Sequence, residues 1–105
     1  MNKINKKELK DMMEHNNIVV IEVLEPKEFK KEHIKGAINI PLAEIVSESK
    51  ERFGFEQDIA VYCSDYDCKA SPTAAKKLQN SGFTHVYDFA GGKKEWKEAG
   101  YPMES

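Results

Sequence analysis

Cys63 and Cys68, the two cysteines of the sequence, are the residues whose type and spacing point to chemistry. Only the segment 64–67 separates them. A deprotonated thiol is a strong nucleophile, and a second thiol at short range can exchange with the disulfide or persulfide that the first one forms. Cys63 closes the apolar segment 58–63, and a polar stretch then leads to a helix expected to open with Ser71 as its cap and Pro72 in its first position.

A strand, a cysteine, a loop and a helix in this order favour a nucleophilic thiolate at Cys63. The first backbone N–H groups of a helix have no partner within it, and the helix dipole adds partial positive charge there. Both stabilise an anion held beside them, so no histidine base is required. The other interpretation is that Cys63 is a small buried apolar side chain at a strand end.

Helical and strand patterns alternate along the chain. Apolar segments without polar alternation suit strands that are buried on both faces of a parallel sheet. We therefore predict an α/β fold, with a parallel sheet of four or five short strands and helices on both faces. The carboxyl ends of the strands, where Cys63 lies, are the expected ligand site of such a sheet. Strands are expected at 18–23, 37–40, 58–63 and 85–89, and helices at 5–16, 26–31, around 42–46, at 71–82 and after Gly91-Gly92.

Composition places the chain in a broad class. It has 105 residues, 40% hydrophobic and 32% charged, with a formal net charge of -2, which predicts one globular domain over 1–105. The sequence lacks the excess of basic residues that is typical of nucleic-acid-binding proteins. No segment has the pattern of a signal peptide or a membrane span. We expect a cytoplasmic protein with no nucleic-acid or membrane partner. Its cysteines are then expected to be reduced thiols, metal ligands or catalytic groups rather than a structural disulfide.

Motifs spread over nearly the whole chain resemble the rhodanese-like, or sulfurtransferase, family. They are the segments 20–23, 28–29, 33–41, 61–63, 71–78, 82–86 and 91–102, the last with the family's Gly-Gly, Trp, Gly and Pro spacing. The resemblance implies a rhodanese fold and a catalytic Cys63. In that family the thiolate takes a sulfane sulfur from a donor such as thiosulfate and passes the persulfide sulfur to a thiophilic acceptor. The implied partners are small sulfur donors and thiol acceptors, or a protein persulfide, and no cofactor is expected.

The active-site loop departs from that family's pattern. If Ser71 takes the place of the serine that follows the family's loop, the segment 63–70 is eight residues long, two more than usual. Ala70 then stands where the family often has arginine, and Lys69 is the nearest cation. A longer loop predicts a wider cradle and a larger substrate. The remaining members of this loop are Ser64, Asp65, Tyr66 and Asp67.

Charge and the upstream motif also differ from the pattern. Asp65 and Asp67 would repel a dianion such as thiosulfate unless their carboxylates point to solvent. Glu22 and Leu24 stand in place of the family's aspartate and arginine, and Glu32 replaces a glycine. These changes bear on substrate preference more than on the fold.

Cys68 has two interpretations. It is either a loop residue without a role, or a resolving thiol that attacks the Cys63 persulfide, releases sulfide and leaves a disulfide. A disulfide requires Cα atoms within about 7 Å, which a curled loop allows.

Other functions remain as alternatives. One is a thiol-redox protein that uses the Cys63–Cys68 pair, and another is a non-catalytic binding module on a rhodanese fold. A phosphatase or arsenate reductase is disfavoured, because Lys69 cannot make the bidentate contacts of an arginine. A metal site is disfavoured by the cysteine spacing and by the scattered positions of His15, His33 and His85.

Overall fold

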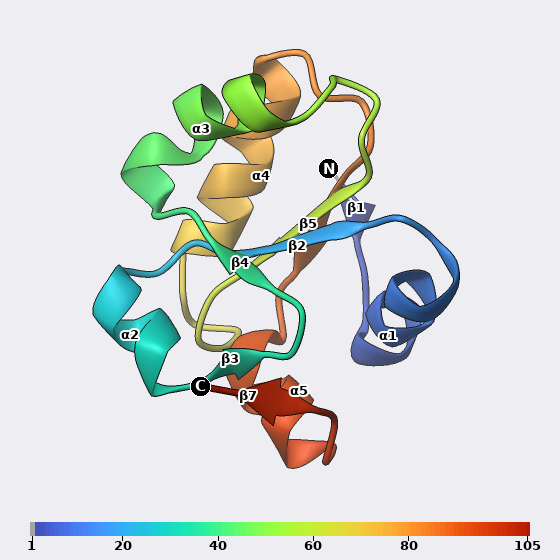
Figure 1. The fold of residues 1–105 in the computed structure, drawn as a ribbon, viewed down its shortest axis with the longest axis vertical. Coiled ribbons are helices and arrows are strands. Elements are labelled where there is room, and N and C mark those ends of the chain that lie inside the picture. Colours follow the sequence, from blue (N-terminus) through green and yellow to red (C-terminus); the bar gives the residue numbers. More distant parts are fainter. Residues whose placement is uncertain (1) are drawn as a thin grey trace.

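A five-stranded parallel sheet in the order β1-β6-β5-β2-β4 forms the centre of the molecule (Figure 1). The computed structural model describes residues 2–105. The strand β5 lies in the middle of the sheet, and all four of its residues are buried. This confirms the parallel α/β sheet, whose strands are β1 (Asn2–Lys3), β2 (Val19–Glu22), β4 (Ile38–Asn39), β5 (Ile59–Tyr62) and β6 (Val86–Phe89).

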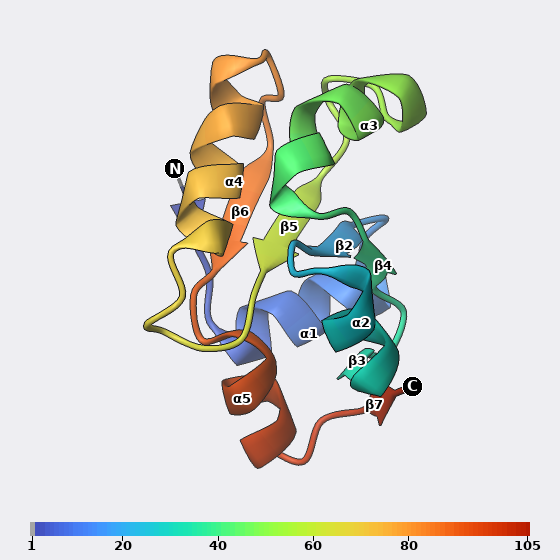
Figure 2. The same ribbon diagram turned by 90° about the vertical axis from the view of Figure 1, so that its left-hand side faces the viewer.

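Helices cover both faces of this sheet, as predicted. Figures 1 and 2 show α3 and α4 on one side and α1 and α5 on the other. Two apolar cores result, one containing Val61 and Leu78 and the other containing Leu9, Tyr62 and Trp96. No helix within residues 2–105 is long and apolar enough to cross a membrane. The helices are α1 (Lys6–His15), α2 (Pro26–Lys31), the 3-10 turn η1 (Leu42–Glu44), α3 (Ile45–Arg52), α4 (Ala70–Asn80) and α5 (Gly92–Glu98).

The start of α4 differs from the prediction. The helix begins at Ala70 with Lys69 as its cap residue, so the assignment of Ser71 as the cap was wrong. The Ser71 hydroxyl instead donates to the Asp88 carboxylate at 2.8 Å. Pro72 is still tolerated, because an N–H in the first helical turn would have no partner within the helix.

A small antiparallel sheet joins β3 (His33–Ile34) to β7 (Met103–Glu104), and the sequence patterns did not predict it. The His33 ring stacks on Phe29 with 3.6 Å between centroids, and its nitrogens contact the Phe29 carbonyl at 2.8 Å and the Glu104 carboxylate at 3.2 Å. His33 is therefore a hydrogen-bonded structural residue that helps to hold the C-terminal strand.

The turn between β6 and α5 brings two distant segments together. Gly92 has φ +64°, and a Cβ at this position would lie 2.5 Å from the carbonyl oxygen of Cys63. Glycine is therefore required both by the left-handed backbone and by the close approach to the residue that follows β5.

We expect Gly92→Ala to destabilise the fold markedly. The left-handed backbone costs about 1 kcal/mol with a side chain present, and overpacking against the Cys63 carbonyl adds about 2 kcal/mol. Gly100→Ala is the matched control, because Gly100 has φ +77° but nothing within 4 Å of its Cβ position. Urea unfolding measures both, and equal losses would contradict the close-approach argument.

Candidate active site at the carboxyl end of β5

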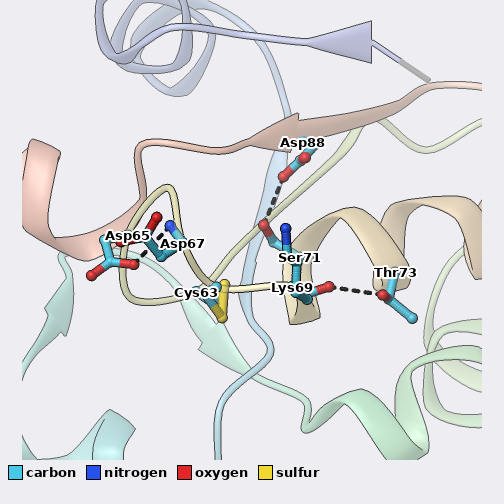
Figure 3. The surroundings of a disulfide bond; sticks show 8 residues. Cys63, Asp65, Asp67, Lys69, Ser71, Thr73 and Asp88 are labelled. Carbon is cyan, nitrogen blue, oxygen red and sulfur yellow. Dashed lines mark hydrogen bonds between the residues drawn. A yellow bond between two sulfur atoms is a disulfide. The ribbon is translucent and has the colours of Figure 1, made fainter.

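Cys63 lies directly after β5, at the carboxyl end of the central strand, where the sequence predicted it. It is 1% exposed and packs with the core beneath α4. Cys68 is half-buried, its Cα atom is 6.4 Å from that of Cys63, and the two sulfurs form a disulfide (Figure 3). The structure therefore shows the oxidised state of the pair, in which neither cysteine is a free thiol.

Asp65 folds the loop back on itself. Its carboxylate accepts a hydrogen bond from the backbone N–H of Asp67 at 3.0 Å, and its carbonyl accepts one from the N–H of Cys68 at 3.2 Å. Tyr66 lies at the tip of this turn and is 69% exposed. The turn returns Cys68 to Cys63, so the pairing of the thiols depends on hydrogen bonds within the loop.

The start of α5 fixes the other side of the loop. The N–H of Lys93 donates to the Cys63 carbonyl, and the N–H of Lys94 donates to the Ser64 carbonyl, each at 2.9 Å. Two amides at the N-terminus of α5 are thus used to hold loop backbone. The closeness of Gly92 to the same carbonyl makes this contact possible.

The first turn of α4 is anchored to β6 through the buried pair of Ser71 and Asp88 (Figure 3). Burial raises the pKa of the Asp88 carboxyl above its ordinary range, and the hydrogen bond from Ser71 partly offsets this. Lys69 is exposed, whereas its carbonyl accepts from the Thr73 hydroxyl at 2.7 Å. Ala70 is half-buried against the core, so no side chain at this position reaches the site as an arginine would.

A buried charged network lies beneath the loop, and the sequence analysis missed it. Glu22 is fully buried, and its carboxylate accepts from the Tyr62 hydroxyl at 2.9 Å and from Lys93 Nζ at 3.1 and 3.2 Å. Lys93 Nζ also donates to the Glu28 carbonyl at 3.2 Å. Burial raises the pKa of Tyr62, and the neighbouring Glu22 charge adds to this shift. A glutamate in an otherwise apolar strand is the signal that a buried cation partner was needed.

Two surface hollows flank the loop, and Asp65 lines both. One, of about 260 Å³, is mainly acidic. The other, of about 290 Å³, is rich in lysine. Cys63 lines neither, so its sulfur is closed off in the disulfide form. The acidic hollow is lined by Asp65, Tyr66, Asp67, Gly91, Lys94, Glu95 and Glu98, and the lysine-rich one by Glu32, Ser64, Asp65, Lys93, Lys94 and Lys97.

Glu32 lines the lysine-rich hollow beside the loop, and the other remaining candidates from the sequence lie outside both hollows. Glu32 forms an ion pair with Lys97 at 2.8 Å, and Leu24 packs against the core. His15 and His85 are exposed, beside Asp11 and Asp58 respectively. Within residues 2–105 no group of three or more His, Cys, Asp or Glu side chains is arranged to hold a metal ion.

Comparison with known proteins identifies the family to which this fold belongs. The rhodanese-like domain family matches residues 5–99. The chain therefore belongs to the rhodanese-like domain family.

Individual relatives differ in what surrounds the domain. A helix-turn-helix-type transcriptional regulator of Mycobacterium tuberculosis is 33% identical over 101 residues, which are 96% of this chain but 44% of the regulator. The thiosulfate sulfurtransferase GlpE of Vibrio cholerae is 32% identical over 94 residues, 90% of this chain and 86% of that enzyme. The solution structure of a rhodanese-like domain from Anabaena superposes with a TM-score of 0.91 at 25% identity, covering 100% of this chain and 80% of that one.

We expect Lys93→Met to lower the free energy of unfolding by about 3 kcal/mol, because it leaves the buried Glu22 carboxylate without its cation. Lys94→Met is the matched control, since that side chain is exposed. Chemical denaturation measures both variants. Adding Glu22→Gln to Lys93→Met should recover part of the loss, and a cost for Lys93→Met as small as that of the control would contradict the assignment.

Proposed function

We propose that this chain is a sulfurtransferase that carries a sulfane sulfur on Cys63 and acts as a single rhodanese domain over 1–105. The observation that supports it most directly is the position of Cys63, between the end of the central strand and the first turn of α4. Membership of a family that includes a thiosulfate sulfurtransferase supports the same reaction class.

The proposed reaction has two displacement steps and begins from the reduced loop. The Cys63 thiolate attacks the sulfane sulfur of the donor, the donor's S–S bond breaks, and a thiolate or sulfite leaves with the electron pair. Cys63 then carries a persulfide. An acceptor thiolate attacks its outer sulfur, and Cys63 thiolate leaves. The unpartnered amides of the loop and of the first turn of α4 are the groups that would stabilise the persulfide anion.

Intact mass spectrometry tests the carrier. The fully reduced protein is treated with thiosulfate or glutathione persulfide. We expect Cys63→Ser to gain no sulfur atom, and Cys68→Ser, which keeps Cys63, to gain one that dithiothreitol removes. Failure of Cys68→Ser to gain sulfur from either donor would contradict the proposed function.

The donor is proposed to be a thiol persulfide or polysulfide rather than thiosulfate. The loop is long, Ala70 supplies no charge, and the acidic hollow brings four carboxylates to its outer side. An anion of charge minus two is repelled more than one of charge minus one. Lys94 is the cation among the residues that line the acidic hollow, whereas Lys93 and Lys97 line only the lysine-rich one.

We expect kcat/KM to be higher for glutathione persulfide than for thiosulfate. Asp67→Asn should raise kcat/KM for thiosulfate by roughly threefold, since one exposed charge at short range in water contributes about 0.5–1 kcal/mol. Glu56→Gln, which changes a carboxylate outside both hollows, controls for net charge. Steady-state assays with the two donors measure this, and a preference for thiosulfate in the unmodified protein would refute the proposed donor class.

A thiol-redox function is the second candidate, and the Cys63–Cys68 disulfide is the observation that favours it. A protein of this kind would exchange dithiol and disulfide without ever holding a sulfane sulfur. The mass experiment on Cys68→Ser separates the two candidate functions, because only a sulfurtransferase gains a sulfur atom.

The cytoplasm is the proposed site of action for either function. Dithiols there keep a cysteine pair such as Cys63 and Cys68 reduced.

A further inference from the structure

We propose that Cys68 is a resolving thiol, so that this chain reduces its own persulfide and releases hydrosulfide. The inference rests on the proposed function, since it requires a persulfide on Cys63. It adds an outcome to sulfur transfer: the sulfane sulfur leaves as sulfide even when no acceptor thiol is present, and the protein is left in the disulfide form.

The structure contains the product of that step. The disulfide joins Cys68 to Sγ of Cys63, the atom that is the inner sulfur of a Cys63 persulfide. A route from persulfide to this product must therefore end with Cys68 bonded to the inner sulfur. The Cα separation of 6.4 Å shows that the loop reaches this geometry with β5 and α4 both formed.

The chemistry balances without another reagent. The Cys68 thiolate attacks Sγ of Cys63, the bond from Sγ to the outer sulfur breaks, and hydrosulfide leaves with the bonding electron pair. The persulfide plus one thiol thus become one disulfide plus hydrogen sulfide. The outer sulfur gains two electrons, and the two cysteines are oxidised to the disulfide.

An external dithiol completes the cycle, and the difference in burial sets the direction of its attack. Cys68 is half-buried, whereas Cys63 is 1% exposed. The dithiol therefore attacks the sulfur of Cys68, and Cys63 leaves as a thiolate. The second thiol of the dithiol then displaces Cys68, and the dithiol is oxidised. Cys63 is regenerated in the form that attacks the next donor.

Asp65 is a positioning residue in this step. Its carboxylate accepts the Asp67 N–H and its carbonyl accepts the Cys68 N–H, which closes the turn that brings Cys68 back. Asp65→Ala removes the side-chain acceptor, whereas Asp65→Asn keeps an acceptor oxygen and removes only the charge. Comparison of these two variants separates the effect of the hydrogen bond in the turn from the effect of the carboxylate charge.

The experiment is a single turnover. Fully reduced, desalted protein without free thiol is mixed with excess thiosulfate, which contains no sulfide, and sulfide is measured together with intact mass. The unmodified chain should release one sulfide per chain, lose two hydrogens in mass and retain no sulfur adduct. Cys68→Ser should keep the adduct and release no sulfide, and Cys63→Ser should do neither.

The variants of Asp65 give the second readout. We expect the rate of sulfide release in Asp65→Ala to be about fivefold below that in Asp65→Asn, the equivalent of about 1 kcal/mol for one hydrogen bond. The rate of sulfite release, which reports persulfide formation, should not differ between the two. Equal rates of sulfide release would overturn the role of Asp65.

The outcomes distinguish this inference from the proposed function. A stable adduct on the unmodified reduced chain, with no sulfide released, overturns the resolving role and leaves the sulfurtransferase intact. A sulfur adduct located on Cys68 would show that Cys68 attacked the outer sulfur of the persulfide, which also overturns the resolving role. Absence of any adduct on Cys68→Ser with thiosulfate here, and with glutathione persulfide in the mass experiment above, overturns both.

Discussion

The backbone contact between Lys93 and Cys63 is the constraint on which the site depends. It joins the start of α5 to the end of β5, and the glycine before it allows the two chains to approach. The same lysine sends its side chain beneath the loop to the buried Glu22 carboxylate. Lys93 thus ties Cys63 to α5 through its backbone and to β2 through its side chain, so contacts outside the loop fix the position of this cysteine.

The opposite end of the loop is held independently. Ser71 and Asp88 fasten the first turn of α4 to β6, and neither residue contacts solvent to any extent. The segment between Cys63 and Ser71 is therefore clamped at both ends and folded by its own hydrogen bonds in the middle. The turn at Asp65 folds this segment back on itself and positions Cys68 beside Cys63.

The fold and the place of Cys63 were predictable because they depend on local patterns. Continuous apolar segments marked β2 and β5, and the helical pattern at 5–16 marked α1, which the structure shows capped by Asn5. The spacing of the two cysteines allowed a disulfide between them, but it carried no information about the turn at Asp65 that brings them together. The Glu22–Lys93 pair joins residues far apart in sequence, and β3 and β7 are two residues each, too short for any periodicity.

The disulfide spans a short segment, which limits how much the redox state of the cysteines affects the stability of the fold. The two cysteines are five positions apart, so the crosslink constrains little of the unfolded chain and contributes only about 2 kcal/mol by loop entropy. In the disulfide form both ends of the loop are held by hydrogen bonds that do not involve the sulfur atoms. Opening the disulfide would release only the segment between Cys63 and Cys68, so we do not expect reduction to bring the chain near the partly unfolded states that proteases and chaperones recognise.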